Sequence, residues 1–521
     1  MQQIKNIIPI LKKWGEKYQA LWYGLFLILL VSLCLWSVLN FIWATEPRGI
    51  GVRSDSVAYF WSAESLVKGA GLGRLTGDGN FKPMTHWPPL YPIMLAIFNG
   101  LGFPILSVAR WMGVALFALN IFLAGLCFAR VTRSLWFSIS AALILAFSPG
   151  FWTTSLDAMT EPLYLSLSLT AVLCFDLYLE NGKRKWLIPL ILSLAGCFLT
   201  RYIGFAILIS MVIVLLLHRI WPLFERIKKG AIILVFSSLP LAGWMVRNML
   251  MTGSPTNRQT HFFPISTEDF TLSVQTLSSW FDPNQAIFQI GLGKVLVILV
   301  VAVFFAFYGL AQKGRPNLPI KTRIPLVSLI YILIYTIGIM ASRLFFDPLI
   351  TFFEQRIAFL IYIPLLCLII YALSTLYRYV RQKSFLISMV LVLFYTLTLY
   401  SYFFVYQTED ETIFNTIRTN GLGYNDITLK DPCVIEKVKG FSSDTIIYSD
   451  NVERLYFFTG RSSNQIVDKN AIPQIASQNK KPDKAFVFFY TPEFNTLAKT
   501  AFPGGVQLCE KTFVYQVNTD H

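Results

Sequence analysis

Residues 21–43 read LWYGLFLILLVSLCLWSVLNFIW, a run without a single charged side chain. A helix needs about 20 apolar residues to cross the hydrocarbon core of a bilayer, so this run predicts a transmembrane helix. The lysines between residues 5 and 17 leave a cleaved signal peptide as the alternative. The run exceeds the roughly 7–15 apolar residues of a signal peptide, and no small-x-small site precedes Glu46, which favours a retained anchor with a cytoplasmic N-terminus.

The whole chain has the composition of a polytopic membrane protein. Of its 521 residues, 55% are hydrophobic and 14% are charged, and the mean hydropathy is +0.56. Such a chain cannot be solvated as one water-soluble globule. About eleven spans are predicted, near residues 21–43, 106–129, 136–155, 159–178, 186–199, 202–218, 231–250, 291–311, 324–342, 356–377 and 385–405.

The net charge of +15 comes from short basic clusters between these spans, a pattern typical of topology signals and unlike a nucleic-acid footprint. The positive-inside rule places the clusters in the cytoplasm, and an odd number of crossings then puts the C-terminus outside the cytoplasmic membrane. The stretch 186–218 decides this count. One long helix there would place every later cluster outside, so the charges favour two short helices meeting at Thr200-Arg201-Tyr202.

The topology leaves outer segments at 44–105, 156–158, 251–290 and beyond about 405. Helices are expected at the outer interface over 57–70 and 88–100, with Trp87 and Tyr91 as interfacial anchors. We therefore expect a transmembrane domain over 1–405, with outer loop 44–105, and a soluble extracytoplasmic α/β domain over 406–521. In that domain, 445–449 and 485–490 are typical of strands, and 470–479 and 492–500 of short helices.

Residues 54–59, Ser-Asp-Ser-Val-Ala-Tyr, place Asp55 and Tyr59 just beyond the first span. A carboxylate at a bilayer edge indicates catalysis or substrate binding, with an N-cap for a helix starting at Ser56 as the structural alternative. Tyr59, one turn later, either faces the same site or is an ordinary interfacial tyrosine.

Further polar candidates gather on the same outer side. Asp157 and Glu161 are spaced i, i+4, which on a helix would place both on one face, for a substrate or a metal; a capping Asp157 with Glu161 in the first turn is the alternative. Arg201 needs an anion or must snorkel. Arg247 and Arg356 are weaker candidates for binding an anion, because each could instead extend to the lipid headgroups. Apart from the terminal His521, the outer-side histidines are His86 and His261. With Asp55, Glu64 or Glu161 they could complete a site for a divalent metal, but no ligand spacing supports one.

Several of these features follow one another in a particular order along the chain: the early Asp55 and Tyr59, the Pro-Pro-Leu-Tyr-Pro segment at 88–92, the Asp157/Glu161 pair, Thr200-Arg201 and Trp244-Met-Val-Arg-Asn. This ordered set resembles the C-type (GT-C) integral-membrane glycosyltransferases, close to the protein O-mannosyltransferase and lipid A aminoarabinose transferase group. The resemblance spans roughly residues 20–360 and implies a multi-pass enzyme that transfers a sugar from a polyprenyl-phosphate donor, with inversion, to a glycan, lipid or protein acceptor on the outer face.

The resemblance also implies roles for individual residues. Asp55 would be the general base, and Arg201 would bind the lipid phosphate, with Tyr59, His86, Asp157, Glu161, Arg247 and Arg356 as further substrate-binding candidates. The protein mannosyltransferases have an Asp-Glu pair at this position, whereas in this chain a single Asp55 is followed by Ser56. A transporter or flippase of a lipid-linked sugar and a non-catalytic assembly subunit are the alternatives.

Cys433 and Cys509 both lie in the expected outer domain, where an oxidising compartment would permit a disulfide. Each lies in or beside an expected strand, Cys433-Val-Ile and Phe513-Val-Tyr, and a disulfide is possible if these two strands are neighbours in one sheet. Two buried thiols are the alternative. The other five cysteines fall within predicted spans and are expected to be packing residues.

Overall fold

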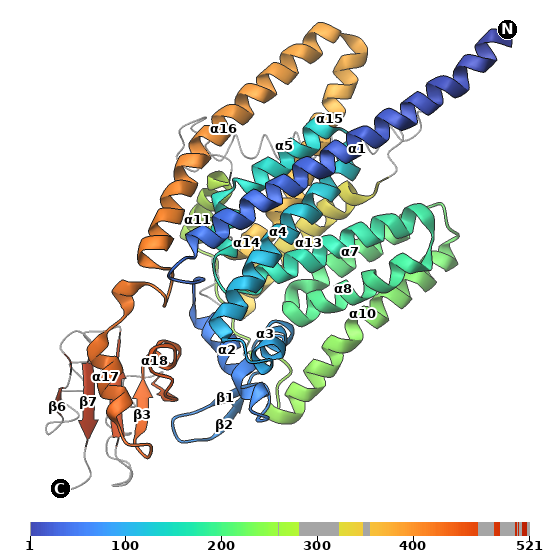
Figure 1. Ribbon diagram of the computed structural model, residues 1–521. Helices are drawn as coiled ribbons and strands as arrows, with labels where there is room; N and C mark the ends of the chain where they lie inside the picture. Colours follow the sequence, from blue (N-terminus) through green and yellow to red (C-terminus); the bar gives the residue numbers. More distant parts are fainter. Residues whose placement is uncertain are drawn as a thin grey trace.

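The computed structural model describes residues 2–258, 260–280, 322–346, 355–466, 484–489, 506–507, 509 and 513–517. A bundle of long helices has a small α/β domain at one end, beside α2 and the β1–β2 hairpin (Figure 1). The predicted fold class, a helical membrane protein with a small C-terminal α/β domain, is confirmed.

The long helices of the bundle are α1 Gln2–Ala44, α4 Ile105–Thr132, α7 Glu161–Asn181, α10 Leu223–Thr252, α13 Ile324–Phe345, α15 Tyr362–Lys383 and α16 Phe385–Asn420. Shorter elements complete it: α5 Leu135–Ala146, α6 Pro149–Ser155, η1 Arg184–Trp186, α8 Leu187–Thr200, η2 Tyr202–Gly204, α9 Phe205–Leu216, α11 Thr267–Ser279, α14 Gln355–Ala358 and η4 Phe359–Ile361. The loop after α1 forms α2 Ser54–Val67, β1 Gly73–Leu75, β2 Phe81–Pro83 and α3 Leu90–Gly100.

Within the described ranges, seven helices are long and apolar enough to cross a membrane, or eight if α5 and α6 form one broken span. The expected span at 136–155 is bent by 55° between these two helices, where Pro149 begins α6. The expected span at 291–311 lies outside the described residues, so the predicted count of eleven is not confirmed. Helix α16 continues through the expected domain boundary at 405, and the compact part begins after Gly421.

The helical segment 186–218 is interrupted at Arg201, as the charge pattern predicted. Helix α8 ends at Thr200, Arg201 is extended (φ −149°, ψ 134°), and η2 and α9 follow. Helix α8 packs against α7 and α10, whereas α9 packs against α10 and α13. The break leaves the Arg201 side chain at the junction of several helices.

A buried carboxylate joins three helices at the end of the bundle that carries the basic clusters. Asp176 of α7 accepts hydrogen bonds from Arg130 Nε of α4 (2.6 Å), Thr322 Oγ1 (2.9 Å) and the Arg323 backbone N–H (2.6 Å) just before α13. A charge this deeply buried is tolerated only when paired and hydrogen-bonded. The opposite end, which we call the domain end, carries α2, α3, the hairpin and the C-terminal domain (Figure 1).

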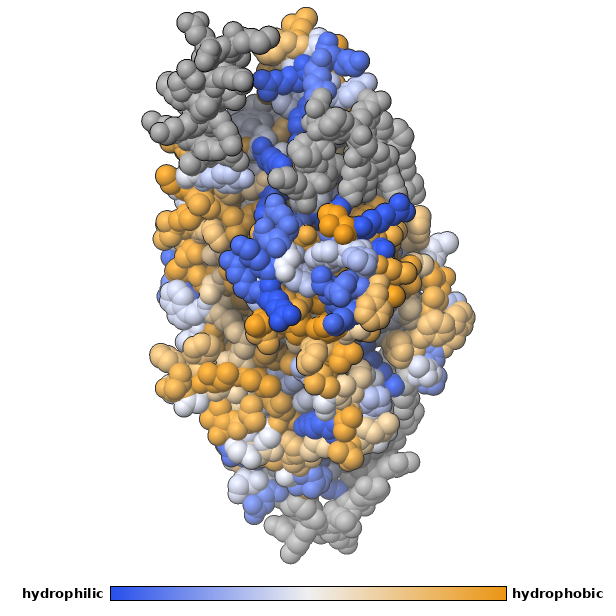
Figure 2. Space-filling model, turned by 90° about the vertical axis from the view of Figure 1, so that its right-hand side faces the viewer, coloured by the Kyte–Doolittle hydropathy of each residue, from blue (hydrophilic) through white to orange (hydrophobic). Residues whose placement is uncertain are grey.

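Large apolar side chains remain exposed along the outside of the bundle. Helices α10 and α16 are little buried, and residues such as Leu239, Val246 and Phe394 face outward. Hydrophobic side chains cover broad areas of the side shown in Figure 2, and hydrophilic ones gather in patches. Apolar areas of this extent are suited to contact with lipid tails.

In its described residues, the C-terminal domain is a mixed five-stranded sheet of order β4-β3-β5-β7-β6 with two helices and a 3-10 turn. Strand β3 is parallel to β4 and β5, whereas β7 is antiparallel to β5 and β6. The elements are η5 Ile427–Leu429, α17 Pro432–Gly440, β3 Ile446–Ser449, α18 Val452–Thr459, β4 Asn464–Gln465, β5 Lys484–Phe488, β6 Val506–Gln507 and β7 Phe513–Val517. The strands expected at 445–449 and 485–490 correspond to β3 and β5; the helices expected at 470–479 and 492–500 lie outside the described residues.

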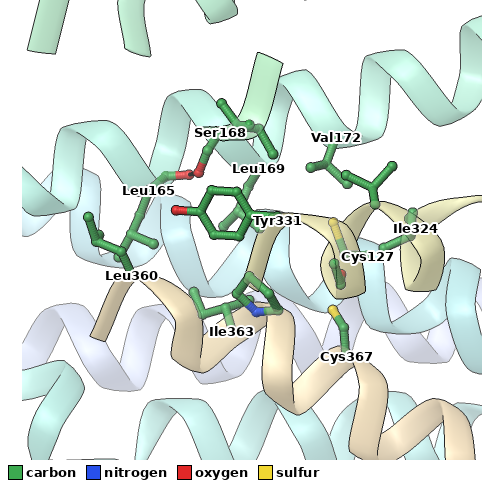
Figure 3. A pocket seen from close by; sticks show the side chains of 14 residues that line it. Cys127, Leu165, Ser168, Leu169, Val172, Ile324, Tyr331, Leu360, Ile363 and Cys367 are labelled. Carbon is green, nitrogen blue, oxygen red and sulfur yellow. Dashed lines mark hydrogen bonds between the residues drawn. The ribbon is translucent and has the colours of Figure 1, made fainter. Parts of the chain in front are cut away.

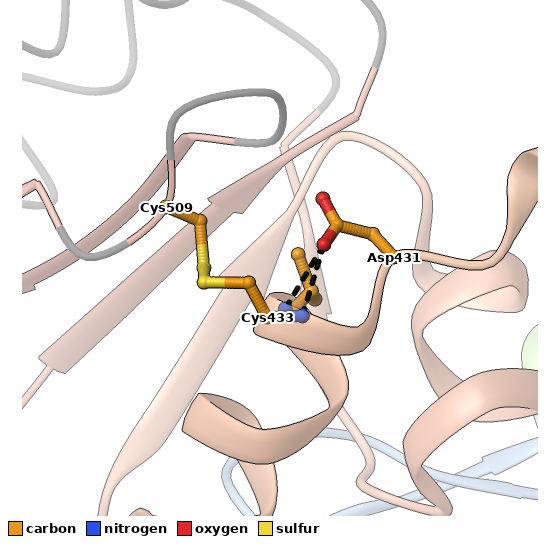
Figure 4. The surroundings of a disulfide bond; sticks show 4 residues. Asp431, Cys433 and Cys509 are labelled. Carbon is orange, nitrogen blue, oxygen red and sulfur yellow. Dashed lines mark hydrogen bonds between the residues drawn. A yellow bond between two sulfur atoms is a disulfide. The ribbon is translucent and has the colours of Figure 1, made fainter.

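The expected disulfide between Cys433 and Cys509 is confirmed, with a Cα–Cα distance of 6.0 Å (Figure 4). The expected strand at Cys433-Val-Ile is wrong, because this segment is the first turn of α17. Asp431 caps the helix by accepting from the backbone N–H groups of Cys433 and Val434, and Pro432 occupies its first position. The bridge therefore ties a helix, not a strand, to the segment before β7.

We predict that replacing both Cys433 and Cys509 with Ser destabilises the C-terminal domain. A bridge that closes a 76-residue separation stabilises a domain by roughly 4 kcal/mol in the chain-entropy treatment. Hydrogen exchange of the intact protein should show faster exchange in β3, β5 and β7, with the membrane helices unchanged. Cys34→Ser, which alters an unbridged cysteine, is the control; equal protection in all three proteins would contradict the prediction.

Candidate functional site

Four charged side chains from four separate elements form a continuous ion-pair chain at the domain end. Asp55 Oδ2, in the first turn of α2, lies 3.3 Å from Arg356 Nη1 of α14. Arg356 Nε lies 3.3 Å from Glu161 Oε1, at the start of α7. The same oxygen lies 2.7 Å from Arg201 Nη1, at the break after α8. Residues far apart in the sequence are thereby brought into one cluster.

Burial distinguishes Glu161 from the other members of the ion-pair chain. The Glu161 side chain is fully buried, whereas those of Asp55 and Arg356 are 30% and 28% exposed. A fully buried carboxylate needs its charge compensated, and two arginines provide this. Glu161 is thus an internal anchor, and Asp55, Arg356 and Arg201, the last 20% exposed, are the members that a bound molecule can reach.

Asp55 and Arg356 line a cavity of about 600 Å³, which we call the main cavity. Its polar part also includes Arg201, Arg258 and Tyr59, and apolar side chains from α9, α13 and their flanks complete its wall: Ile203, Phe205, Ile339 and Phe346. Gly338 lies on this wall, where an added Cβ would be 2.7 Å from Ile203 Cδ1. The lining of the main cavity thus combines cationic and apolar side chains.

Asp55 and Arg356 also line a second cavity, of about 390 Å³, which we call the side cavity. Its other lining residues are polar: Arg53, Ser54, Thr153, Thr154 and Asp157. Asp157 Oδ2 accepts from Arg53 Nε at 3.0 Å. The Asp55–Arg356 pair therefore lies where two cavities of different chemistry meet.

The segment just before Asp55 is fixed by backbone hydrogen bonds on both sides. The Gly51 N–H donates to Leu156 O (2.7 Å), and Gly51 O accepts from the Ala158 N–H (2.8 Å). Val52 O accepts from the Tyr424 N–H at 2.7 Å. A Cβ at Gly51 would overlap Asp157 Oδ1, so the close approach requires glycine. The link between α16 and the C-terminal domain thus helps to position Asp55.

Two expectations from the sequence are wrong: Asp55 as an N-cap, and Asp157 on one helical face with Glu161. Helix α2 begins at Ser54, so Asp55 lies in its first turn and is not the cap; Arg53 occupies that position, and its N–H donates to Ser56 Oγ at 2.9 Å. Asp157 precedes α7, whose N-cap is Thr160, so the helical i, i+4 relation between Asp157 and Glu161 does not exist. The two carboxylates have separate arginine partners, Arg53 and Arg201.

Aromatic side chains form the wall of the main cavity next to Asp55. Tyr59 is buried and lies edge-on to Trp87 and Tyr91, with ring centroids 5.9 and 5.3 Å apart. Burial raises the pKa of Tyr59, so its phenol is neutral. His86 lines the cavity with its ring against Trp87. Trp87 and Tyr91, expected as interfacial anchors, both pack against Tyr59.

Arg247 lies apart from the ion-pair chain and is not a lining residue of the main cavity or the side cavity. Its guanidinium donates to Met84 O (2.7 Å) and Leu72 O (3.2 Å), at the base of the β1–β2 hairpin. These contacts fix the hairpin against the end of α10, and its position does not support the phosphate-binding role. The other histidine of this side, His261, donates its backbone N–H to Phe345 O (3.0 Å) and is not among the cavity residues.

Two cavity residues were not found from the sequence. Arg258 lies in the loop after α10, with its guanidinium 5.8 Å from the Tyr202 ring centroid. Tyr335, in the middle of α13, donates its hydroxyl to Ile357 O at 2.9 Å, next to Arg356. A loop arginine and a tyrosine inside an apolar helix have no spacing pattern that marks them, so only the fold could identify them.

The described ranges contain no group of three or more His, Cys, Asp or Glu side chains that could bind a metal ion. A much smaller cavity, of about 30 Å³, lies between α4, α7, α13 and α15 (Figure 3). Its walls are mainly apolar, with the hydroxyls of Ser168, Ser328 and Tyr331 as polar exceptions. It is large enough for about one or two water molecules and is not a substrate site.

No protein-family model matches the chain, and no curated protein matches it. Among solved structures it aligns with ArnT from Cupriavidus metallidurans bound to undecaprenyl phosphate, at 14% identity over 94% of this chain and 97% of that chain, with a TM-score of 0.48. It also aligns with arabinofuranosyltransferase AftD from Mycobacteria at 14% identity, 92% of this chain, 39% of that chain and TM-score 0.49. It aligns as well with the S. cerevisiae protein O-mannosyltransferase Pmt1-Pmt2 complex bound to the sugar donor. The sequence identity there is 17%, the alignment covers 50% of this chain and 37% of that chain, and the TM-score is 0.35.

At 14–17% sequence identity, these alignments are likenesses of overall fold.

We predict that Glu161→Gln destabilises the protein by about 3–5 kcal/mol, because it leaves two arginines beside a buried position without a counter-charge. The midpoint of thermal unfolding in detergent would measure this loss. Glu180→Gln is the matched control: Glu180 also pairs with an arginine, Arg130, at 2.7 Å, but its side chain is 30% exposed. Equal effects of the two substitutions would contradict the role of Glu161 as a buried anchor.

Proposed function

We propose that this protein is a glycosyltransferase that moves a sugar from a polyprenyl-phosphate donor to an acceptor hydroxyl, with Asp55 as the general base. One observation supports this most strongly. The Asp55–Arg356 pair lines both a cavity with cationic and apolar walls and a second cavity with polar walls. A lipid-linked sugar phosphate and a hydroxyl-bearing acceptor are the two ligands suited to these chemistries.

The main cavity fits the donor. Three arginines, Arg201, Arg258 and Arg356, line it with Asp55 as its only lining carboxylate among the described residues. This excess of cations suits a phosphate, which arginine binds through charge-assisted hydrogen bonds. The apolar wall between α9 and α13 suits the start of a prenyl tail, and Tyr59 and Trp87 offer aromatic surfaces to the sugar.

The side cavity fits the acceptor. In the proposed reaction Asp55 takes the proton of the acceptor hydroxyl as its oxygen attacks the anomeric carbon. The bond from that carbon to the phosphate oxygen breaks, and polyprenyl phosphate leaves with the electron pair. Arg201 and Arg356 offset the charge that develops on the leaving phosphate. A single displacement of this kind inverts the anomeric configuration and requires one carboxylate base.

We further propose that the site faces the outside of the cytoplasmic membrane, because the basic ends of α4, α7 and α15 lie at the opposite end of the bundle. The N-terminus would then be cytoplasmic and the C-terminal domain extracytoplasmic. A reporter fused after His521 should be active only as an extracytoplasmic probe. A transporter or flippase would be favoured by paired charges in the middle of the spans, whereas this ion-pair chain lies at their ends.

The proposed activity can be tested with the purified full-length protein and a panel of undecaprenyl-phosphate-linked sugars. Release of undecaprenyl phosphate in the presence of cell-envelope extract, with one sugar of the panel consumed faster than the rest, is expected. Binding of these donors without any turnover would favour a transporter or an assembly subunit. Absence of both binding and turnover would contradict the proposal.

We predict that Arg201→Ala weakens donor binding and slows turnover at least tenfold, since charge-assisted hydrogen bonds to phosphate are among the strong ones. Arg201→Lys should retain part of both, because lysine supplies the charge without the planar fork. Arg418→Ala is the control: Arg418 donates to the carbonyls of Trp43 and Glu46 and is not among the cavity residues. Normal donor affinity and turnover in Arg201→Ala would contradict the phosphate-binding role.

A further inference from the structure

A third cavity, of about 210 Å³, adjoins the main cavity between the β1–β2 hairpin, α2 and the C-terminal domain. We call it the hairpin cavity. Arg74 and Lys82 of the hairpin line it, and Glu453 and Gln465 come from the C-terminal domain. His86 and Trp87 line both this cavity and the main cavity. A molecule bound in the main cavity against Trp87 is therefore next to the hairpin cavity.

The hairpin places two cations directly opposite each other. Strands β1 and β2 are antiparallel, and their register pairs Arg74 with Lys82. Like charges at directly opposed positions destabilise a pair of strands unless an anion lies between or beside them. One such anion is present, because Glu453 Oε1 lies 3.4 Å from Arg74 Nη1.

Glu453 compensates only one of the two cations. Lys82 is exposed and forms no ion pair with any residue in the part of the chain that the structure describes. Two cations and one carboxylate leave the hairpin cavity with an excess positive charge. The C-terminal domain keeps this arrangement in place, since Asn464 Oδ1 accepts from the Gly77 N–H at 3.0 Å and Tyr456 stacks on Trp61 with centroids 3.9 Å apart.

We propose that the hairpin cavity binds an anionic substituent, a carboxylate or a phosphate, on the sugar that is transferred, with Lys82 as its main ligand. This rests on the proposed function and deepens it, because it names the donor class as acidic sugars. Arg74, with N–H groups beyond the one that faces Glu453, and Gln465 can add hydrogen bonds to the same group. The C-terminal domain is then part of the donor specificity site.

Undecaprenyl-phosphate-linked glucose and glucuronic acid form a matched pair of probes, since they differ only by a hydroxymethyl group or a carboxylate at C6. Binding of each to the full-length protein in detergent micelles is measured for wild type, Lys82→Glu and Lys68→Glu. Lys68 is an exposed lysine at the C-terminal end of α2 and is not a lining residue of the three cavities. Lys68→Glu therefore controls for the change in net charge.

The glucuronosyl donor should bind wild type and Lys68→Glu about tenfold more tightly than the glucosyl donor, the scale of one charge-assisted contact. Lys82→Glu should abolish or reverse this preference while leaving the affinity for the glucosyl donor within about twofold. Equal affinity of the two donors for wild type, or a preference that persists in Lys82→Glu, would overturn the proposal.

A phospholipid headgroup is the other source of an anion. The measurement is therefore repeated with added phosphatidylglycerol and with added phosphatidylcholine. A preference that both lipids leave intact supports the donor as the source, whereas its selective loss with phosphatidylglycerol assigns the anion to the lipid and overturns the proposal. If neither donor binds wild type, the proposed function itself fails; if both bind alike, only the anionic-sugar site fails.

Discussion

The arrangement of the site depends on Glu161, a fully buried carboxylate that forms ion pairs with two arginines. A single buried charge is costly, so Arg201 and Arg356 are drawn to it, and this fixes the start of α7, the break after α8 and the short helix α14 relative to one another. Arg356 then reaches outward to Asp55. The buried Glu161 thus positions the accessible members of the ion-pair chain, and these members line the cavities.

Asp55 is also fixed from the other side, by the segment that precedes it. Gly51 and Val52 are hydrogen-bonded to the turn before α7 and to the turn after α16, so the catalytic candidate depends on residues more than 350 positions apart in the sequence. The C-terminal domain also contacts α2, through the hydrogen bond from Tyr456 to Glu64 at 2.6 Å. Its placement therefore bears on both Asp55 and the cavity walls beside it.

The sequence predicted the class of fold and the members of the ion-pair chain, because apolar length and charge bias determine which helix ends lie together. It could not predict their pairing, since Asp55 and Arg356 are separated by 301 residues. Helical spacing failed at Asp157, which is not in a helix, and the strand expected at Cys433 is a helix capped by Asp431. Arg258 carries no local pattern and was recognisable only once the loops were in place.

We propose Asp55 as the general base at the junction of the main cavity and the side cavity. Asp55→Asn tests this role most directly, because the amide keeps the size of the side chain and its hydrogen bond to Arg356 yet cannot accept a proton at the required strength. Transfer and donor binding are measured on the same preparation, using the sugar donor that wild type consumes. Transfer should be lost while donor affinity remains within a few-fold of wild type; transfer within a few-fold of wild type would contradict the role of Asp55 as base.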